Sequence, residues 1–198
     1  MTSKNGVIAM PNDAVSMWVD QVLGAFKYNE PKDFASVYAP SNIALSKYWG
    51  KRCSQFNLPV TGSISISLAK HGTHTQLSVC DTQSHVVLLN GKKLDANDNF
   101  VLKICAWLDR VLPAYLKLRV ETTNTVPTAA GLASSASGFA ALTLATNELM
   151  GWGLSESQLS ALARLGSGSA SRSLWHGFVK WNHGEKADGS DSVDRKST

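Results

Sequence analysis

The hydrophobic positions near the start of the chain follow the period of a helix. Apolar residues recur at spacings of three and four from Val15 to Phe26, after Asn12 and Asp13 as possible N-terminal caps. Pro31 then ends the pattern. We therefore predict a helix that packs one face against a core.

The period then changes to that of strands. Residues 63–68 alternate strictly between large apolar side chains and serines, which is typical of a half-buried strand. The dipeptide His71-Gly72 indicates a turn after it, and Asn90-Gly91 is a strong hairpin signal. The strands predicted in this part of the chain are residues 36–39, 63–68, 75–79 and 86–89.

The second half of the chain alternates between helical and strand patterns. Helices are predicted at residues 100–112, 134–150 and 155–164, the last from the capping-box pair Ser155 and Gln158. Strands are predicted at residues 116–122 and 175–181, whereas residues 182–198 are polar and offer nothing that could pack a core. This order predicts an α+β fold, a mixed sheet with helices packed on it.

Composition narrows the class of protein. With 198 residues, 43% of them hydrophobic and 17% charged, the chain can form one packed domain, or one domain and a fragment of another. The net charge of +4 suits an anionic partner, but the basic residues are scattered, which disfavours nucleic acid.

Cellular location follows from the cysteines and from the N-terminus. Cys53, Cys80 and Cys105 form no CxxC pair, so free thiols in a reducing compartment are expected. We see no signal peptide and no apolar stretch of membrane-spanning length. A cytoplasmic protein without a membrane partner is the simplest interpretation.

A loop of small residues leads directly into the helix predicted at 134–150. Its sequence is Pro127-Thr-Ala-Ala-Gly131-Leu-Ala-Ser134-Ser135-Ala136, and it is not a Walker A loop, because no Gly-Lys-Ser/Thr follows. Small side chains let backbone N–H groups approach an anion, and the helix N-terminus adds unpaired donors. The segment is either a phosphate-binding loop or a packed turn with an ordinary N-cap.

Two further segments could hold anions. The segment from Ala39 to Arg52 carries three cations within six residues, interleaved with aromatic side chains; it could hold a polyanion or be a solvated basic segment. The segment Arg164-Leu-Gly-Ser167-Gly-Ser169-Ala-Ser-Arg172-Ser could ring an anion with hydroxyls and an arginine, or be a flexible loop after a helix.

Together these three segments resemble the diphosphomevalonate decarboxylases, within the superfamily of galactokinase, homoserine kinase, mevalonate kinase and phosphomevalonate kinase. The first loop is similar to the phosphate loop of the whole superfamily. Asn42-Ile-Ala-Leu-Ser-Lys47-Tyr-Trp-Gly-Lys51 and Gly166-Ser-Gly-Ser-Ala-Ser-Arg172-Ser-Leu resemble the decarboxylase branch. The resemblance covers roughly residues 36–192 and keeps the order of the motifs.

The resemblance implies a fold and a reaction. The fold is a ribosomal-protein-S5-domain-2-like N-terminal domain. The family uses ATP and Mg²⁺ to phosphorylate the 3-hydroxyl of mevalonate 5-diphosphate. The phosphate then leaves as CO₂ departs, giving isopentenyl diphosphate, and positioning and electrostatics should carry most of the rate. A homodimer is also implied.

Site residues are carried over by position. Lys47, near the transferring phosphate, and Arg172, on the carboxylate, are the implied catalytic residues, and Asn42 is expected to support the first loop. Ser134 or Ser135 should lie near Mg²⁺. The implied substrate contacts are Tyr48, Trp49, Gly50, Lys51, Ser167, Gly168, Ser169, Ala170, Ser171 and Arg172. The implied ATP contacts are Pro127, Ala130, Gly131, Leu132, Ala133, Ser134, Ser135 and Ala136.

The chain also departs from the family pattern. No Arg follows the Asn-Gly hairpin within Asp95-Ala-Asn-Asp-Asn-Phe100, and Leu58-Pro-Val-Thr-Gly-Ser63 replaces a more usual Asn-Ser-Ser pattern. The catalytic Asp of an Asp-x-Gly-Pro-Asn segment is missing, and so is a ferredoxin-like C-terminal domain. We therefore expect a truncated form with a helical extension (1–34), an ATP- and substrate-binding domain (35–192) and a truncated polar tail (193–198).

Other functions remain open at this level. A mevalonate-type kinase that does not decarboxylate would share the phosphate loop, and a non-catalytic remnant would explain the missing Asp. A metal site is not expected: His71 and His74 flank a predicted turn, and Asp188, Asp191 and Asp194 have no EF-hand spacing.

Overall fold

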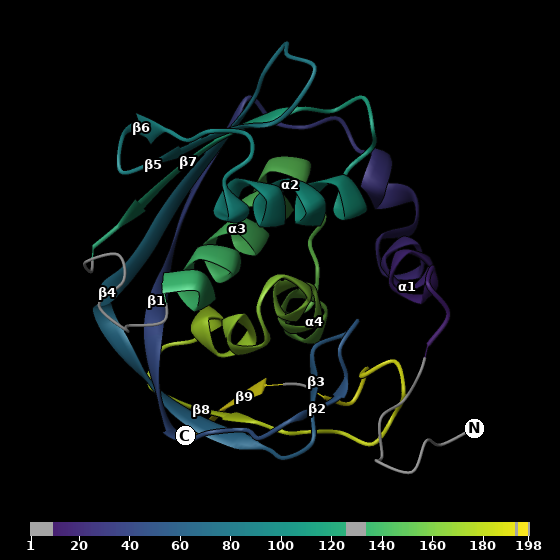
Figure 1. The fold of residues 1–198 in the computed structure, drawn as a ribbon, viewed down its shortest axis with the longest axis vertical. Coiled ribbons are helices and arrows are strands. Elements are labelled where there is room, and N and C mark those ends of the chain that lie inside the picture. Colours follow the sequence, from purple (N-terminus) through teal and green to yellow (C-terminus); the bar gives the residue numbers. More distant parts are fainter. Residues whose placement is uncertain (1–9, 126–133, 193, 198) are drawn as a thin grey trace.

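The computed structural model describes residues 10–125, 134–192 and 194–197. Within them one mixed sheet of seven strands carries the helices on a single face (Figure 1). The helices are α1 (Ala14–Leu23), α2 (Asn99–Val111), α3 (Ser134–Met150) and α4 (Glu156–Gly166), with the 3₁₀ helices η1 (Gly24–Tyr28) and η2 (Gly168–Leu174). The α+β class predicted from the sequence is confirmed.

The long strand β4 (Ser63–Val79) organises the sheet. Strand β1 (Phe34–Ser46) runs antiparallel along one side of it, whereas β8 (Phe178–Trp181) and β7 (Leu118–Asn124) share the other side. Strand β5 (Val86–Leu89) lies parallel to β7, so the sheet is mixed. Strands β6 (Lys92–Lys93) and β9 (Asp194–Ser197) end the order, and β2 (Lys51–Cys53) pairs with β3 (Leu58–Pro59) in a small separate sheet.

The turn predicted at His71-Gly72 is wrong, because β4 runs through it without interruption. Gly72 lies opposite Pro40, and a Cβ added there would stand 2.2 Å from the carbonyl oxygen of Ala39. This glycine therefore permits a close approach of β1, next to the register shift between Pro40 and Asn42. The strand expected at residues 36–39 is correspondingly longer, since β1 continues to Ser46.

The alternation at residues 63–68 is confirmed, but the buried face is the polar one. Ser63 and Ser65 are almost fully buried, whereas Ile64 is 41% exposed on the other face of the sheet. The serine face is buried because η2 packs there beside β8 and β1. Ser63 on this face accepts a hydrogen bond from Arg172 of η2. Periodicity thus predicts the two faces of this strand, but not that the serine face is the one that packs inward.

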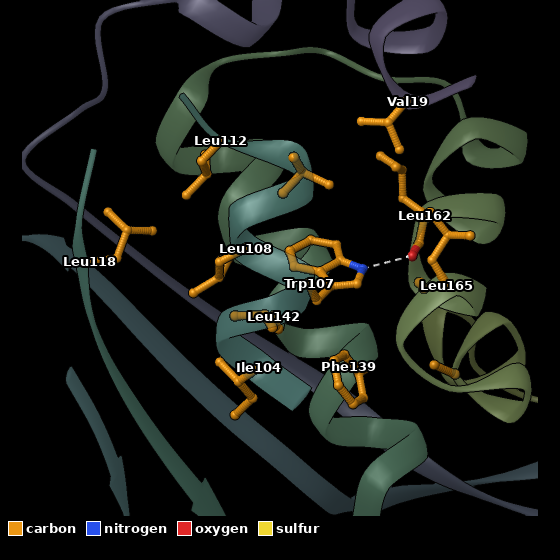
Figure 2. Close-up of a cluster of buried hydrophobic side chains, with 14 of the residues drawn as sticks. Val19, Ile104, Trp107, Leu108, Leu112, Leu118, Phe139, Leu142, Leu162 and Leu165 are labelled. Carbon is orange, nitrogen blue, oxygen red and sulfur yellow. Dashed lines mark hydrogen bonds between the residues drawn. The ribbon is translucent and has the colours of Figure 1, made fainter. Parts of the chain in front are cut away.

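The main core lies between the sheet and α2, α3 and α4 (Figure 2). Trp107 of α2 is buried, and its indole N–H donates to the carbonyl oxygen of Leu162 in α4 over 3.0 Å. Helix α1 adds Val15, Val19 and Leu23 to the same core. The predicted helices are thus confirmed, although Phe26 falls in η1 and is 53% exposed.

Local sequence signals are confirmed in detail. The carboxylate of Asp98 accepts the N–H of Phe100 at the start of α2, and Ser155 and Gln158 form the reciprocal capping box of α4. Asn90 and Gly91 both have positive φ, 50° and 78°, as a two-residue hairpin requires.

The described residues after Trp181 add no apolar side chain to the core, as predicted, but polar groups among them are buried against it. Ser192 is fully buried, and the buried guanidinium of Arg164 donates to the carbonyl oxygens of Ser192, Gly189 and Phe56. Residues 194–197 then form β9 on β8. The strand predicted at 175–181 is shorter, because η2 occupies residues up to 174 and β8 begins at Phe178.

His85 gives the fold a pH dependence. Its Nδ1 accepts the N–H of Leu118 over 3.1 Å, and its Nε2 lies 3.3 Å from Asp109. Burial lowers the pKa of His85, partly opposed by the Asp109 carboxylate. At a pH between the two pKa values the unfolded chain therefore binds more protons than the folded protein. The stability that neutral His85 contributes is fully present above its unfolded pKa of about 6.5 and is lost as the pH falls through the lower, folded pKa.

We expect the free energy of unfolding of the protein to fall more steeply between pH 7.5 and pH 5 than that of a His85→Asn variant. The asparagine oxygen can accept the Leu118 N–H but does not titrate. Urea unfolding across this pH range measures the difference between the two proteins. Parallel pH profiles would contradict the assignment.

Candidate functional site

In the segment after β1, residues 47–52, the charged and aromatic side chains differ in how far they are exposed to solvent. Lys47 and Trp49 are exposed, Trp49 to 76%, whereas the ring of Tyr48 is half-buried. Gly50 turns the chain with a positive φ of 67° into β2, where Lys51 donates to the side chain of Asn57 over 2.7 Å. This segment therefore presents two exposed ammonium groups, at residues 47 and 51, and one ring turned inward.

Asn57 connects this segment to the third motif. Its side-chain amide donates to the carbonyl oxygens of Arg164 and Leu165 at the end of α4, over 2.9 and 3.3 Å. Ser167 follows as the C-cap of that helix. Residues 51 and 167 are 116 positions apart in the sequence. Asn57 nevertheless links the two motifs, because it accepts from Lys51 and donates to the end of α4, the helix that leads to Ser167.

The third motif forms η2 rather than a flexible loop. Ser167 and Ser169 are half-buried, with their hydroxyls 3.4 Å apart, and Ser171 donates to the carbonyl oxygen of Gly168. Ala170 and Ser171 are fully buried. Ser167 and Ser169 are thus the open hydroxyls, while Ala170 and Ser171 hold the 3₁₀ turn.

Asn42 ties β1 to η2. Its amide nitrogen donates to the hydroxyl of Ser173 over 2.7 Å and to the carbonyl oxygen of Ser169 over 3.3 Å. Its Oδ1 atom is buried and has no hydrogen-bond partner among the described residues. The structure thus shows Asn42 supporting the third motif.

Arg172 is the buried cation of the site. It is 3% exposed, and its Nη1 donates to the hydroxyl of Ser63 over 2.6 Å. The guanidinium carbon lies 5.8 Å from the ring centroid of Tyr48 and 5.5 Å from that of Trp181. The guanidinium thus lies beside two aromatic rings that touch each other and beside a hydroxyl, surroundings that suit a cation whose planar fork binds a planar anion.

Gly168 sets the position of Tyr48. A Cβ added at this glycine would stand 2.9 Å from the tyrosine hydroxyl, although the backbone there is unstrained. We expect Gly168→Ala to lower the free energy of unfolding by about 1 kcal/mol, because the ring must move. The loss should be smaller in a Tyr48→Phe background, where that hydroxyl is absent, and urea unfolding of the four proteins measures this coupling. Equal losses in both backgrounds would contradict the contact.

The nucleotide side of the site is only partly described. Pro127, Ala130, Gly131, Leu132 and Ala133 lie outside the described residues, as does the side chain of Ser134. Helix α3 begins at Ser134; in its first turn Ser135 is exposed and Ala136 fully buried. The phosphate-loop prediction therefore stays a prediction, although the helix that it requires is present.

A pocket of about 290 Å³ adjoins the start of α3, and the sequence did not predict it. Apolar walls come from the β5–β6 hairpin and from the start of α2, and polar groups come from Asp98, Thr122 and Asn124. Asn124 donates its backbone N–H to the side chain of Asn90 in the hairpin turn. The Asn-Gly dipeptide signalled the hairpin but not its position beside α3. The lining residues are Leu89, Leu94, Asp98, Phe100, Thr122, Asn124, Ser135 and Gly138.

Buried hydroxyls run between the two sides of the site. Ser41 donates to Ser137 over 3.2 Å, the hydroxyls of Ser137 and Thr73 lie 2.7 Å apart, and Thr73 donates to the side chain of Asn124 over 2.8 Å. Ser41 directly precedes Asn42, and Asn124 lines the pocket. The two sides are thus held in one hydrogen-bonded frame.

Three absences hold for the part of the chain that the structure describes. It contains no group of three or more His, Cys, Asp or Glu side chains that could hold a metal ion. It contains no helix long and apolar enough to cross a membrane. The three cysteines, all within that part, form no disulfide, and Cys53 is buried.

The fold and the site define a class: an α+β domain whose candidate anion-binding site is formed by a buried arginine, half-buried serines and exposed lysines. Residues 39–194 match the model of the diphosphomevalonate decarboxylase-like N-terminal domain. The chain belongs to this family.

Individual relatives agree. The diphosphomevalonate decarboxylase of Eremothecium gossypii is 43% identical over 174 residues, which cover 80% of this chain and 44% of the relative. A solved structure of the mevalonate diphosphate decarboxylase from Enterococcus faecalis, concerning its mevalonate diphosphate mediated ATP binding, has a TM-score of 0.72 and 39% identity and covers 83% of this chain and 51% of its own.

A further solved structure, of MDDEF in complex with MVAPP, AMPPCP and magnesium, has a TM-score of 0.71 and 38% identity. The match covers 83% of this chain and 50% of that one. The chain thus spans about half the length of the relatives that it matches.

Proposed function

We propose that this chain is the substrate-binding and ATP-binding portion of a diphosphomevalonate decarboxylase, which converts mevalonate 5-diphosphate to isopentenyl diphosphate. The observation that carries the proposal is the convergence of Arg172, Tyr48 and the Ser167–Ser169 pair beside the exposed lysines of the 47–51 segment. These groups come from two motifs more than a hundred residues apart.

The proposed substrate has a negative group at each end, and the site offers two kinds of cation. Arg172, buried beside the rings of Tyr48 and Trp181, suits the single carboxylate, because its planar fork can bind both oxygens. Lys51 with Tyr48, Ser167 and Ser169 suits the larger, more hydrated diphosphate, which an exposed ammonium can follow as it binds. Lys47 would then lie toward the 3-hydroxyl and stabilise charge on the phosphate that is transferred.

The pocket beside α3 fits the base of a nucleotide. Leu89, Leu94 and Phe100 provide apolar walls, and Asp98 and Asn124 provide polar groups at its edge. Residues 127–136 would bind the phosphates, with Ser134 or Ser135 beside Mg²⁺. Bound ATP would supply the phosphoryl group that makes the tertiary 3-hydroxyl able to leave.

The proposal also covers the cellular location, the oligomeric state and the domain boundaries of the protein. We infer a cytoplasmic protein that acts as a homodimer, with residues 35–192 as the ligand-binding unit, residues 1–34 as an extension and residues 193–198 as a tail. Three free cysteines agree with a reducing compartment.

A single assay tests the reaction. The purified chain is incubated with Mg²⁺, ATP and carboxyl-labelled mevalonate 5-diphosphate, and ADP and CO₂ are followed together. Equal release of both is the expected result. ADP without CO₂ would replace the proposal by a mevalonate-type kinase, and neither product would contradict catalysis by this chain and favour a non-catalytic remnant. An Arg172→Met variant assayed in parallel is the control for contaminating activity.

A further inference from the structure

The most buried aromatic ring of the site cannot itself be open to a ligand. Trp181 is fully buried in β8, directly opposite Ser63 in the register of β4 and β8. Ser63 accepts the hydrogen bond from Arg172, and the Trp181 ring centroid lies 5.5 Å from the same guanidinium. Strand pairing thus fixes the hydroxyl and the ring that hold Arg172 as one unit.

The ring is itself held from behind. The indole N–H of Trp181 donates to the hydroxyl of Ser192 over 3.2 Å, and that hydroxyl donates to the carbonyl oxygen of Asn182 over 3.1 Å. The carbonyl oxygen of Ser192 in turn accepts from the buried Arg164. Residues 182–192 therefore clamp the indole in one orientation, although their sequence is polar.

Tyr48 completes the arrangement on the open side. Its ring meets that of Trp181 edge to face, with centroids 5.1 Å apart and planes at 76°. Tyr48 is half-buried and can reach a ligand, whereas Trp181 can act only through Arg172 and Tyr48. The two rings thus differ in role: one faces the ligand and the other supports the cation.

We propose that Trp181, locked by Ser192, is a positioning residue that holds the Arg172 guanidinium where it receives the carboxylate of the substrate. This inference rests on the proposed function, since it takes the ligand of Arg172 to be that carboxylate. It predicts that Trp181 affects the affinity for the carboxylate end of the ligand, through Arg172, more than the affinity for the diphosphate end, which it reaches only through its edge contact with Tyr48.

The test compares two ligands by titration calorimetry: mevalonate 5-diphosphate, and isopentenyl diphosphate, which keeps the diphosphate and lacks the carboxylate. Trp181→Phe removes the indole N–H and weakens the ring's attraction for the cation. We expect it to weaken the binding of mevalonate 5-diphosphate about 3- to 30-fold, the range of a buried cation–π contact, and the binding of isopentenyl diphosphate by a smaller factor, because the ring also contacts Tyr48. Ser192→Ala keeps the ring and frees its orientation, so it should shift the same ratio in the same direction by a smaller factor.

Trp107→Phe is the matched control, since it too removes a buried indole N–H, the one bonded to Leu162 in the core. It should leave the ratio of the two affinities at the wild-type value. An unchanged ratio in Trp181→Phe, or an equal change in Trp107→Phe, would overturn the inference. If Trp181→Phe does not fold, Ser192→Ala decides. A wild-type chain that binds neither ligand, or binds both equally, would instead overturn the proposed function, and the inference with it.

Discussion

Replacing Arg172 with methionine is expected to weaken the binding of mevalonate 5-diphosphate about 10- to 150-fold, because a hydrogen bond to a charged group contributes about 1.5–3 kcal/mol. Arg172 is a buried cation of the candidate site that lies beside two rings, with its Nη1 bonded to Ser63. Arg172→Lys should lose most of the same affinity, since an ammonium cannot bind both carboxylate oxygens. Titration calorimetry measures both.

Arg110→Met is the matched control, because Arg110 is an exposed residue in the last turn of α2 and its loss changes the net charge by the same amount. It should leave the affinity within about twofold of wild type, as expected for a solvated charge outside the site. Nucleotide affinity should be unchanged in Arg172→Met. Equal losses of affinity from the substitutions at 110 and 172 would mean that the net positive charge of the protein, and not a specific contact of Arg172, attracts the ligand.

Replacing Arg164 with methionine is expected to lower the free energy of unfolding by about 3 kcal/mol. The fully buried guanidinium donates to the carbonyl oxygens of Phe56, Gly189 and Ser192. Methionine fills similar space but leaves these acceptors without their donor, at about 1–3 kcal/mol for each buried group, partly offset because a buried charge is removed.

Urea unfolding measures this loss, with Arg119→Met as the control. Arg119 is exposed and pairs with Glu121 on the open face of β7, so its replacement should change stability by no more than about 0.5 kcal/mol. A loss below about 1 kcal/mol in Arg164→Met would show that residues 189–192 do not depend on this side chain.

Much of the fold could be predicted because its signals are local. The capping box at Ser155 and Gln158, the hairpin at Asn90 and the apolar stripes of α1 and α2 each act within a few residues. Each of these features depends only on residues close by in the sequence, so it can be predicted from the sequence alone.

The errors have a common physical cause, which is that distant parts of the chain decide the outcome. Gly72 was interpreted as a turn because the approach of β1 cannot be seen from its neighbours. The serine face of β4 is buried because Arg172 needs a hydroxyl there. Ser192 is buried because Arg164, 28 residues earlier, requires its carbonyl oxygen. None of these partners is within one turn or one hairpin of the residue that it controls.

The candidate site shows the same division. The motifs identified Tyr48, Lys51, the serines of η2 and Arg172 as residue types suited to anions. The supporting residues Ser63, Trp181 and Ser192 have no motif, since their roles depend on strand register and on a buried clamp. The pocket beside α3 was missed for a similar reason, because hairpin, helix start and strand end meet there only after folding.

A crystal structure of the chain with mevalonate 5-diphosphate would show which residues hold each end of the substrate. We expect the carboxylate on the guanidinium of Arg172 and the diphosphate between Lys51, Tyr48 and the hydroxyls of Ser167 and Ser169, with Trp181 unmoved beside the arginine. A ligand bound elsewhere, or bound with its diphosphate on Arg172 and its carboxylate in solvent, would contradict it.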